Sequence, residues 1–325
     1  MKKYAIGIDI GGTKIAAGVT DTSGHVQATF YSRAHTGHPP ALVMDGLEEA
    51  VQSVLEKSGL SHDDIEGVGI GCAGHINRQT GRVLTSSNLP DWEDYPLRDM
   101  ARQRLDYPVV IDNDSHCAAL GEYLFGAGRG CQYMCYVTFS TGYGMGVIID
   151  GKVYRGAIGS TGEIGHTIIV PDGELCTCGK RGCVMAYACG LALSRFACER
   201  VRSGEPTLLR DTCGASPSYI SGETIAMAAK NGDHLALELI KNAARYFGIS
   251  LANILELFNP EMVVIGGGLA RMGTLLLEPC MEAMRQNTHP ELRNATRFEL
   301  SQLWDDAGML GAAALIWENQ ESSKE

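Results

Sequence analysis

Hydrophobic residues near the N-terminus form short runs, at 4–10 and 14–20, which predict two buried β-strands joined by a tight glycine-containing turn. A third strand is predicted at 26–33. Apolar residues then recur at helical spacing between 40 and 57, and a strand-like run follows at 67–72. Strands followed by a helix and a further strand are typical of an α/β domain.

The elements predicted between 109 and 150 again combine strands, a helix and a glycine-containing turn. The pattern predicts a strand, a helix and a pair of strands at 109–112, 115–125, 133–141 and 145–150. Residues 7–13 and 137–142 each place a polar, glycine-containing turn between two strands, which is a weak internal repeat. We therefore expect two related α/β lobes.

The second half of the chain is predicted to be mainly helical. Helices are expected at 186–202, 223–230, 234–258 and 307–318, with one strand at 262–265 and a frayed polar tail at 319–325. A chain of 325 residues exceeds the size at which one hydrophobic core keeps growing. We expect an N-terminal lobe at 1–118 and a C-terminal lobe at 119–305, with an active site between them and the last helix, 306–318, packed back on the first lobe.

The composition argues against nucleic-acid binding, a membrane span and export. Apolar residues make up 45% of the chain, charged residues make up 20%, and the formal net charge is −11, so the basic surface that nucleic-acid phosphates require is not expected. No run approaches the roughly 18 apolar residues of a membrane helix, and Asp9 interrupts the apolar run that follows the N-terminus. The 11 cysteines are odd in number and lie in a large chain, which favours a reducing cytoplasm.

Three glycine-containing turns are candidates for phosphate binding. In the first, Asp9, Gly11, Gly12, Thr13 and Lys14 place a carboxylate, a hydroxyl and an ammonium around backbone N–H groups that glycine leaves accessible. A predicted strand follows Lys14, so the turn is neither a Walker loop nor a dinucleotide-binding fingerprint. Taken alone, it is equally compatible with a simple tight hairpin.

The second and third turns also contain glycines that would leave backbone N–H groups accessible to a phosphate. Thr141 and Gly142 lie in the second, and Gly266 and Gly267 directly follow a predicted buried strand. The three turns together resemble the actin and hexokinase type of ATPase, in which two hairpin turns hold the phosphates and a later glycine segment lies beside the adenosine.

One histidine and three cysteines form a candidate metal site. His166, Cys176, Cys178 and Cys183 supply one imidazole and three thiolates, a closed tetrahedral ligand set typical of structural Zn²⁺. The alternative is that the cysteines are small buried hydrophobic residues, which their close spacing disfavours. Because the set leaves no position for water, we expect a structural zinc that holds the loop 166–183 in place.

Four motifs match the ROK family of sugar kinases in order and spacing across almost the whole chain. They are Asp9-x-Gly11-Gly12-Thr13-Lys14, Asn113-Asp114, Glu163-x-Gly165-His166 and Cys176-x-Cys178-Gly179-x-x-Gly182-Cys183. The resemblance implies an α/β fold of the two-lobed, actin-like ATPase (ribonuclease H-like) type with a cleft between the lobes. It also implies phosphorylation of a sugar by ATP, Mg²⁺ oriented by Asp9, and the same four zinc ligands.

The resemblance also implies roles for particular residues. Transfer of a phosphoryl group to a sugar hydroxyl needs a carboxylate that accepts the hydroxyl proton, and Asp114 stands at the position of this general base. On local sequence alone, a cap of the helix expected from Ser115 is the favoured role of Asp114, and the surrounding motif reverses this preference. Sugar contacts are implied for Gly74, Asn88, Asn113, Asp114, Glu163 and His166. Asn88 alone is equally typical of a turn before proline.

Two positions depart from the family pattern. After Gly182-Cys183 the family usually has Leu-Glu, whose carboxylate accepts hydrogen bonds near the anomeric end of the sugar, whereas Met185 stands here. We hypothesise that the substrate lacks a free hydroxyl there, as in a glycoside or an anhydro sugar. His116 replaces a common asparagine, and the sequence does not decide between a role in the pocket and a local cap.

Two other classes of function compete with a kinase. ROK transcriptional repressors carry an N-terminal helix-turn-helix, for which the segment before Asp9 has no room. A sugar-binding regulator or pseudo-kinase is suggested only by Met185. The family resemblance favours a sugar and ATP as partners, transfer to the 6-hydroxyl of a hexose, and a homodimer or homotetramer.

Overall fold

The computed structural model describes residues 3–12, 14–33, 39–86, 89, 91–213 and 218–322. The chain divides into two compact units. The first comprises the chain up to Tyr136, Gly146–Gly162 and the chain from Ser301 onward, and the second comprises Val137–Met145 and Glu163–Leu300. This division differs from the expected boundary at 118–119, which falls inside a helix, Asp114–Phe125.

The first unit is built on a five-stranded sheet. Its strand order is β3 (Val26–Ser32), β2 (Ile15–Asp21), β1 (Tyr4–Ile10), β4 (Ile65–Cys72) and β7 (Val109–Asn113). β2 runs antiparallel to β1 and β3, whereas β1, β4 and β7 are parallel. The unit also contains the hairpin of β5 (His75–Asn77) and β6 (Arg82–Thr85), with helices η1 (His62–Asp64), α1 (Pro40–Ser58), α2 (Leu97–Leu105), α3 (Asp114–Phe125), η5 (Trp304–Asp306) and α10 (Ala307–Ser322).

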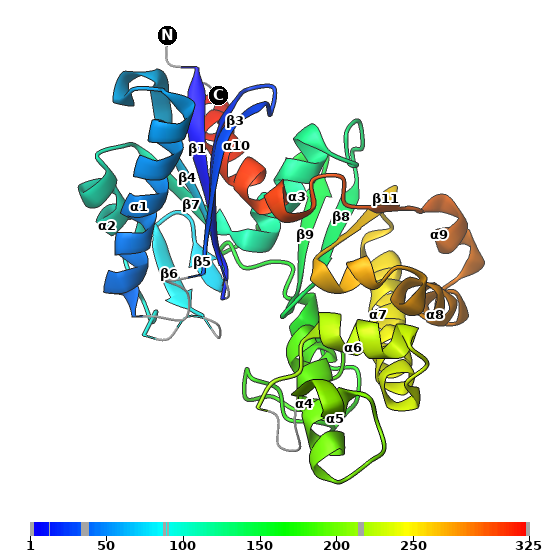
Figure 1. The fold of residues 1–325 in the computed structure, drawn as a ribbon. Helices are drawn as coiled ribbons and strands as arrows, with labels where there is room; N and C mark the ends of the chain where they lie inside the picture. Colours follow the sequence, from blue (N-terminus) through cyan, green and yellow to red (C-terminus); the bar gives the residue numbers. More distant parts are fainter. Residues whose placement is uncertain are drawn as a thin grey trace. The chain divides into compact units, whose positions relative to one another are not determined.

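Helices cover both faces of this sheet (Figure 1). Alternate residues of β1, Ile6 and Ile8, are fully buried in the core that α1 closes with Leu47. On the other face α10 lies directly on the strands, because Gly7 and Gly69 have no side chain. A Cβ at these glycines would come within 1.9 Å of the Met309 carbonyl oxygen and 1.7 Å of the Ala312 carbonyl oxygen.

The second unit contains most of a second five-stranded sheet. The strand order is β10 (Lys152–Val153), β9 (Tyr143–Ile149), β8 (Met134–Phe139), β11 (Met262–Gly266) and β12 (Arg297–Leu300), and β8 and β9 belong in part to each unit. Its helices are η2 (Ile164–His166), η3 (Val184–Ala186), α4 (Gly190–Arg202), α5 (Leu209–Cys213), α6 (Gly222–Lys230), α7 (His234–Phe258), η4 (Gly268–Met272), α8 (Thr274–Gln286) and α9 (Pro290–Ala295). The Phe247 ring of α7 stacks on Phe139 with ring centroids 3.7 Å apart, which joins this helix to the sheet.

The predicted elements are confirmed with a few differences. The expected helix at 186–202 begins at Gly190, because a short 3₁₀ turn precedes it, and α10 continues to Ser322 where a frayed tail was expected from 319. The helices α2, α5, α8 and α9 and the strands β5, β6, β10 and β12 were not predicted. Within the described residues, no helix is both long and apolar enough to span a bilayer.

Candidate active site and metal cluster

The carboxyl ends of β1, β4 and β7 bring two candidate carboxylates to one edge of the first sheet. Asp9 pairs in register with Gly71, which in turn pairs with Asp112. Asp114 follows β7 directly as the first residue of α3. A Cβ on Gly71 would lie 3.1 Å from Cys117 Sγ and 3.6 Å from the Asp114 Cα, so the start of α3 packs directly on the central strand.

The pKa values of both carboxylates are raised. Burial, followed by the nearby charge of Asp114, raises the pKa of Asp9 to about 7, although Lys14 opposes this effect. Burial also raises the pKa of Asp114, against hydrogen bonds from Ser115 and the charge of His116. Such an acidic pair in a partly desolvated place is suited to bind a cation or to accept a proton.

Asn113, not Asp114, is the N-cap of α3. Its Oδ1 accepts hydrogen bonds from the backbone N–H groups of Ser115 and His116, at 2.8 and 3.3 Å. Its Nδ2 donates to the Gly74 carbonyl oxygen at 3.0 Å, so two of the predicted sugar contacts, Asn113 and Gly74, touch each other. Gly74 has φ of +126°, and a Cβ there would come within 2.5 Å of the Thr85 carbonyl oxygen, so the position requires glycine.

The first glycine turn is closed by a hydrogen bond from the Gly11 N–H to the Lys14 carbonyl oxygen at 3.0 Å. The Lys14 ammonium lies 3.1 Å from Asp305, a partner that the sequence did not reveal. A Cβ on Gly308 would lie 2.8 Å from Asp9 Oδ2, so this glycine in the first turn of α10 makes room for the carboxylate. Of the predicted site residues, Thr13 and Asn88 lie outside the described residues.

His116 belongs to a buried polar network. Its Nδ1 lies 3.0 Å from Asp112 Oδ1, and its Nε2 lies 3.1 Å from the Thr161 carbonyl oxygen. The Thr161 hydroxyl lies 3.1 Å from the same Nε2. Arg155 Nε binds the other oxygen of Asp112 at 2.6 Å. His116 therefore holds the residue before Asn113, which answers the question that the sequence left open.

The charge of Asp112 is stabilised by these contacts. Burial opposes its ionisation, but the hydrogen bond from His116 and the charges of Arg155 and His116 outweigh burial and hold the pKa of this carboxyl well below its usual range. The strand end that precedes Asp114 is thus fixed by a paired and ionised aspartate.

The second and third glycine turns meet in the second unit. Gly267 has φ of +88°, and a Cβ there would lie 2.4 Å from the Phe139 carbonyl oxygen, at the end of β8 where the Thr141 turn begins. The N–H of Leu191, at the start of α4, donates to the Thr141 carbonyl oxygen at 3.2 Å. A Cβ on Gly142 would lie 3.6 Å from Met185 Sδ, so the buried Met185 side chain lies beside this turn.

The Glu163-x-Gly165-His166 motif is held against the same turn. Gly165 lies on the start of β9, where a Cβ would come within 2.3 Å of the Tyr143 carbonyl oxygen. The 3₁₀ turn η2 that contains Gly165 ends at His166, and the His166 N–H donates to the Glu163 carbonyl oxygen at 3.0 Å. The glycine therefore fixes the positions of Glu163 and His166 relative to β9.

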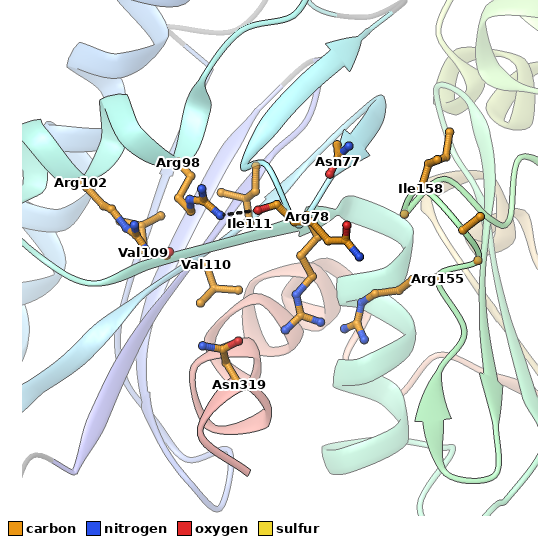
Figure 2. A pocket seen from close by; sticks show the side chains of 14 residues that line it. Asn77, Arg78, Arg98, Arg102, Val109, Val110, Ile111, Arg155, Ile158 and Asn319 are labelled. Atoms are coloured by element: carbon orange, nitrogen blue, oxygen red, sulfur yellow. Dashed lines mark hydrogen bonds between the residues drawn. The ribbon is translucent and has the colours of Figure 1, made fainter. Parts of the chain in front are cut away.

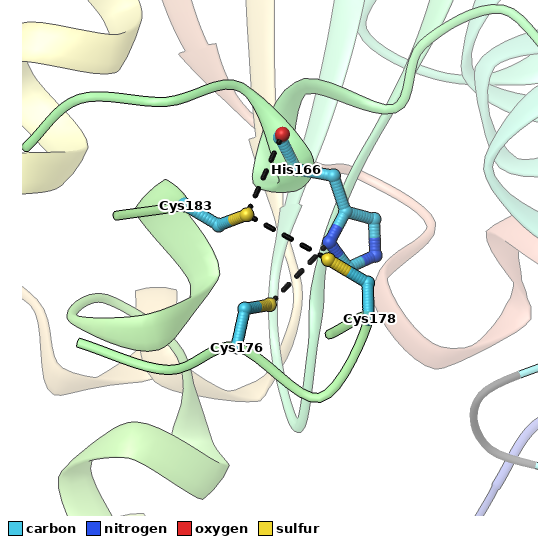
Figure 3. Close-up of side chains that lie close together, drawn as sticks. All are labelled: His166, Cys176, Cys178 and Cys183. Atoms are coloured by element: carbon cyan, nitrogen blue, oxygen red, sulfur yellow. Dashed lines mark hydrogen bonds between the residues drawn. The ribbon is translucent and has the colours of Figure 1, made fainter. Parts of the chain in front are cut away.

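The four predicted zinc ligands form a compact cluster (Figure 3). Their ligand atoms all lie within 4.8 Å of one another. Cys176 Sγ is 3.6 Å from His166 Nδ1, and Cys178 Sγ is 3.7 Å from Cys183 Sγ. A tetrahedral zinc with bonds of about 2.3 Å to sulfur and about 2.0 Å to nitrogen would place these pairs about 3.6 and about 3.8 Å apart. The donor set and its spacing therefore fit Zn²⁺.

Comparison with known proteins identifies relatives over the full length of this fold. The family model described as ROK family matches residues 5–319. A glucokinase from Streptomyces coelicolor is 38% identical over 316 residues, which are 96% of this chain and 97% of that protein. A xylose repressor from Caldicellulosiruptor bescii is 33% identical over 96% of this chain and 77% of the repressor.

A solved structure resembles this one closely. A ROK family glucokinase from Streptomyces griseus, in complex with glucose and AMPPNP, superimposes with a TM-score of 0.85 at 38% identity, covering 97% of this chain and 99% of that chain. The α/β fold is therefore the actin-like ATPase fold of ROK kinases, as the sequence predicted. With the family model matched from residue 5 to residue 319, this chain belongs to the ROK family.

Proposed function

We propose that this protein is an ATP-dependent sugar kinase that phosphorylates a hexose or hexose derivative. The observation that carries the proposal is the arrangement of Asp9, Asn113 and Asp114 at one sheet edge beside the first glycine turn. Kinase relatives of nearly the same length support it, since one of them binds glucose and an ATP analogue.

Asp114 acts as the general base in this proposal. Its carboxylate accepts the proton of the attacking sugar hydroxyl, for which we propose the 6-hydroxyl, while the oxygen bonds to the γ-phosphorus of ATP and the bond to ADP breaks. Asn113 holds the start of α3, and because both lone pairs of its Oδ1 are used by backbone N–H groups, it contacts the sugar through its remaining Nδ2 hydrogen. We propose further sugar contacts from Gly74, Asn88, Glu163 and His166.

The nucleotide contacts come from the three glycine turns. We assign them to Gly11, Gly12, Thr13, Lys14, Thr141, Gly142, Gly266 and Gly267. Asp9 would hold Mg²⁺, in large part through water, since magnesium keeps much of its hydration shell. The positive charge of Mg²⁺ would neutralise charge on the phosphates, and it would also favour the ionised form of Asp9, whose pKa is raised to about 7.

The cluster of His166 and three cysteines holds a structural zinc in this proposal. The metal would fix the loop from His166 to Cys183 and orient His166 through Nδ1. No disulfide joins the ten cysteines whose side chains the structure describes, and we propose a reducing, cytoplasmic location.

Met185 shapes the substrate specificity. Its thioether lies beside Gly142 and is buried, so it offers an apolar contact where the family pattern has a carboxylate. We propose that sugars with a blocked anomeric position are better substrates than free glucose.

The test is ATP-dependent phosphorylation across free hexoses, N-acetylhexosamines, anhydro sugars and β-glucosides, with Asp114→Asn as the control. Turnover that disappears in the control is the expected result, and glucose as the best substrate would disprove the role given to Met185. Sugar binding without turnover on any member of the panel would instead favour a regulator, a function found among the relatives.

A further inference from the structure

A cavity of about 410 Å³ lies in the first unit, where the start of β7 faces α2 and the loop that follows β10 (Figure 2). Val109, Val110 and Ile111 of β7 line the cavity. Asn319 of α10 also lines it and lies below Val110 in this view. None of the residues assigned above to sugar, nucleotide or zinc is among the described residues that line it. The cavity is therefore a separate feature of the molecule.

Four arginines line this cavity: Arg78, Arg98, Arg102 and Arg155. The side chains of Arg78, Arg98 and Arg155 are only 21%, 23% and 18% exposed, so water screens their charges weakly. Among the described residues of the lining there is no aspartate or glutamate. A cavity with this lining attracts anions.

Each of the two neighbouring carboxylates, Glu318 and Asp112, contacts more than one side chain. Glu318 lies 3.0 Å from Arg78 and 2.7 Å from Arg155, so one carboxylate serves two guanidinium groups. Asp112 lies 2.6 Å from Arg155 and 3.0 Å from His116, so it too is shared. Two carboxylates thus serve two of the four arginines that line the cavity, and Asp99 lies 3.4 Å from a third, Arg98.

The size and the rest of the lining indicate more than inorganic phosphate. The volume of about 410 Å³ lies within the range of roughly 300–1,000 Å³ that is typical of small-molecule sites. The side chains of Asn77 and Gln79 offer amide groups for hydroxyls, and Ile158 and Val110 offer apolar contact. Guanidinium groups match the planar, bidentate geometry of phosphate oxygens.

We propose that this cavity is a binding site for a small phosphorylated polyol, such as a sugar phosphate, with the phosphate on the arginines. The site is connected to the catalytic edge, because Arg155 binds Asp112, and Asp112 Oδ1 accepts a hydrogen bond from the Asn113 N–H at 2.8 Å. A phosphate that competes for Arg155 weakens the ion pair between Arg155 and Asp112. The loss of this ion pair shifts Asn113, which directly precedes Asp114. Binding in the cavity therefore changes turnover, a consequence that rests on the proposed kinase function.

Calorimetric titration of the full chain with glucose 6-phosphate tests the binding. The titration is run with a saturating concentration of the best sugar of the panel and a non-hydrolysable ATP analogue, so that the catalytic site is occupied, and is repeated without them. Arg102→Gln removes a cavity guanidinium, and Ile158→Glu places a carboxylate at an exposed position of the lining. Arg104→Gln is the matched control, because Arg104 is also on α2 but binds Asp45 and is not among the lining residues.

We expect wild type and Arg104→Gln to bind glucose 6-phosphate with the same Kd, and Arg102→Gln and Ile158→Glu to bind it at least about tenfold more weakly. Glucose alone should give no binding to the cavity. Equal affinity in all four proteins, or no binding in any, would overturn the site. Inorganic phosphate that binds as tightly as glucose 6-phosphate would overturn the recognition of a polyol.

The effect on turnover is measured separately. Glucose 6-phosphate should change kcat in wild type and Arg104→Gln by at least about twofold and leave Arg102→Gln unaffected. Intact binding with no change in kcat would refute the connection through Arg155. A chain with no kinase activity would show no turnover in any variant, while the titration would still report on the cavity.

Discussion

The raised pKa of Asp9 predicts how the stability of the folded protein changes with pH. In the protein without nucleotide or Mg²⁺, its pKa is raised from 3.8 to about 7 by burial and by the charge of Asp114. The folded protein therefore keeps a proton that the unfolded chain releases between these two values. The contribution of Asp9 to stability is fully present below about pH 4 and is lost as the pH rises through about 7.

The magnitude follows from the pKa shift. Each pKa unit corresponds to about 1.4 kcal/mol, so the shift from 3.8 to about 7 corresponds to at most about 4 kcal/mol. Asp9 keeps some exposure to solvent, which reduces this value. Asp9→Asn removes the cost of burying a charge. We therefore expect the free energy of unfolding of the variant, relative to that of wild type, to rise by about 1 to 3 kcal/mol as the pH is raised from 4.5 to 8.

The assay is urea unfolding of the ligand-free protein at pH 4.5, 6 and 8, with wild type, Asp9→Asn and Asp21→Asn. Asp21 ends the neighbouring strand, and its pKa is lowered by the Ser23 hydroxyl, so its replacement should destabilise the protein at pH 8. A stability difference between Asp9→Asn and wild type that stays constant from pH 4.5 to pH 8 would refute the account of Asp9.

Three further predictions concern the metal cluster, the buried network and one glycine. Cys178→Ser, at the most exposed of the four candidate ligands, should abolish zinc measured by elemental analysis and lower the melting temperature, whereas full zinc content would contradict the assignment. Arg155→Met should destabilise the fold by about 3 kcal/mol in urea, because it leaves Asp112 and Glu318 without their shared partner; a loss below about 1 kcal/mol would show that the network matters little. Gly165→Ala should lower the melting temperature by several degrees, because its Cβ would come within 2.3 Å of the Tyr143 carbonyl oxygen, while Gly268→Ala, with open space around it, should not.

Much of the fold could be predicted because its hydrophobic patterns are regular. The helix α7 has the predicted bounds, His234–Phe258, since its apolar stripe is long and Asp233 caps it. By contrast, α2 was missed because Arg98, Arg102 and Arg104 hide its short apolar stripe, and α8 was missed because Pro279 lies inside it.

The candidate site was predicted in part. The spacing of His166 and the three cysteines predicted a cluster that the structure brings together, because the ligands lie close in the sequence. The contacts of Asp112 could not be predicted, since they join Arg155 and, through it, Glu318, which lies 163 positions further along the chain. The packing of α10 on Gly7 likewise depends on the fold as a whole.

The most direct test of the kinase proposal compares wild type and Asp114→Asn on the best sugar of the panel, with ATP and Mg²⁺ saturating and sugar binding measured in parallel. The account predicts a fall in kcat of about 100-fold or more with sugar affinity nearly unchanged, because Asn113 caps α3 and the new asparagine keeps an Oδ1 that accepts from the Ser115 N–H. A variant that keeps near wild-type kcat would contradict the role of Asp114 as the general base.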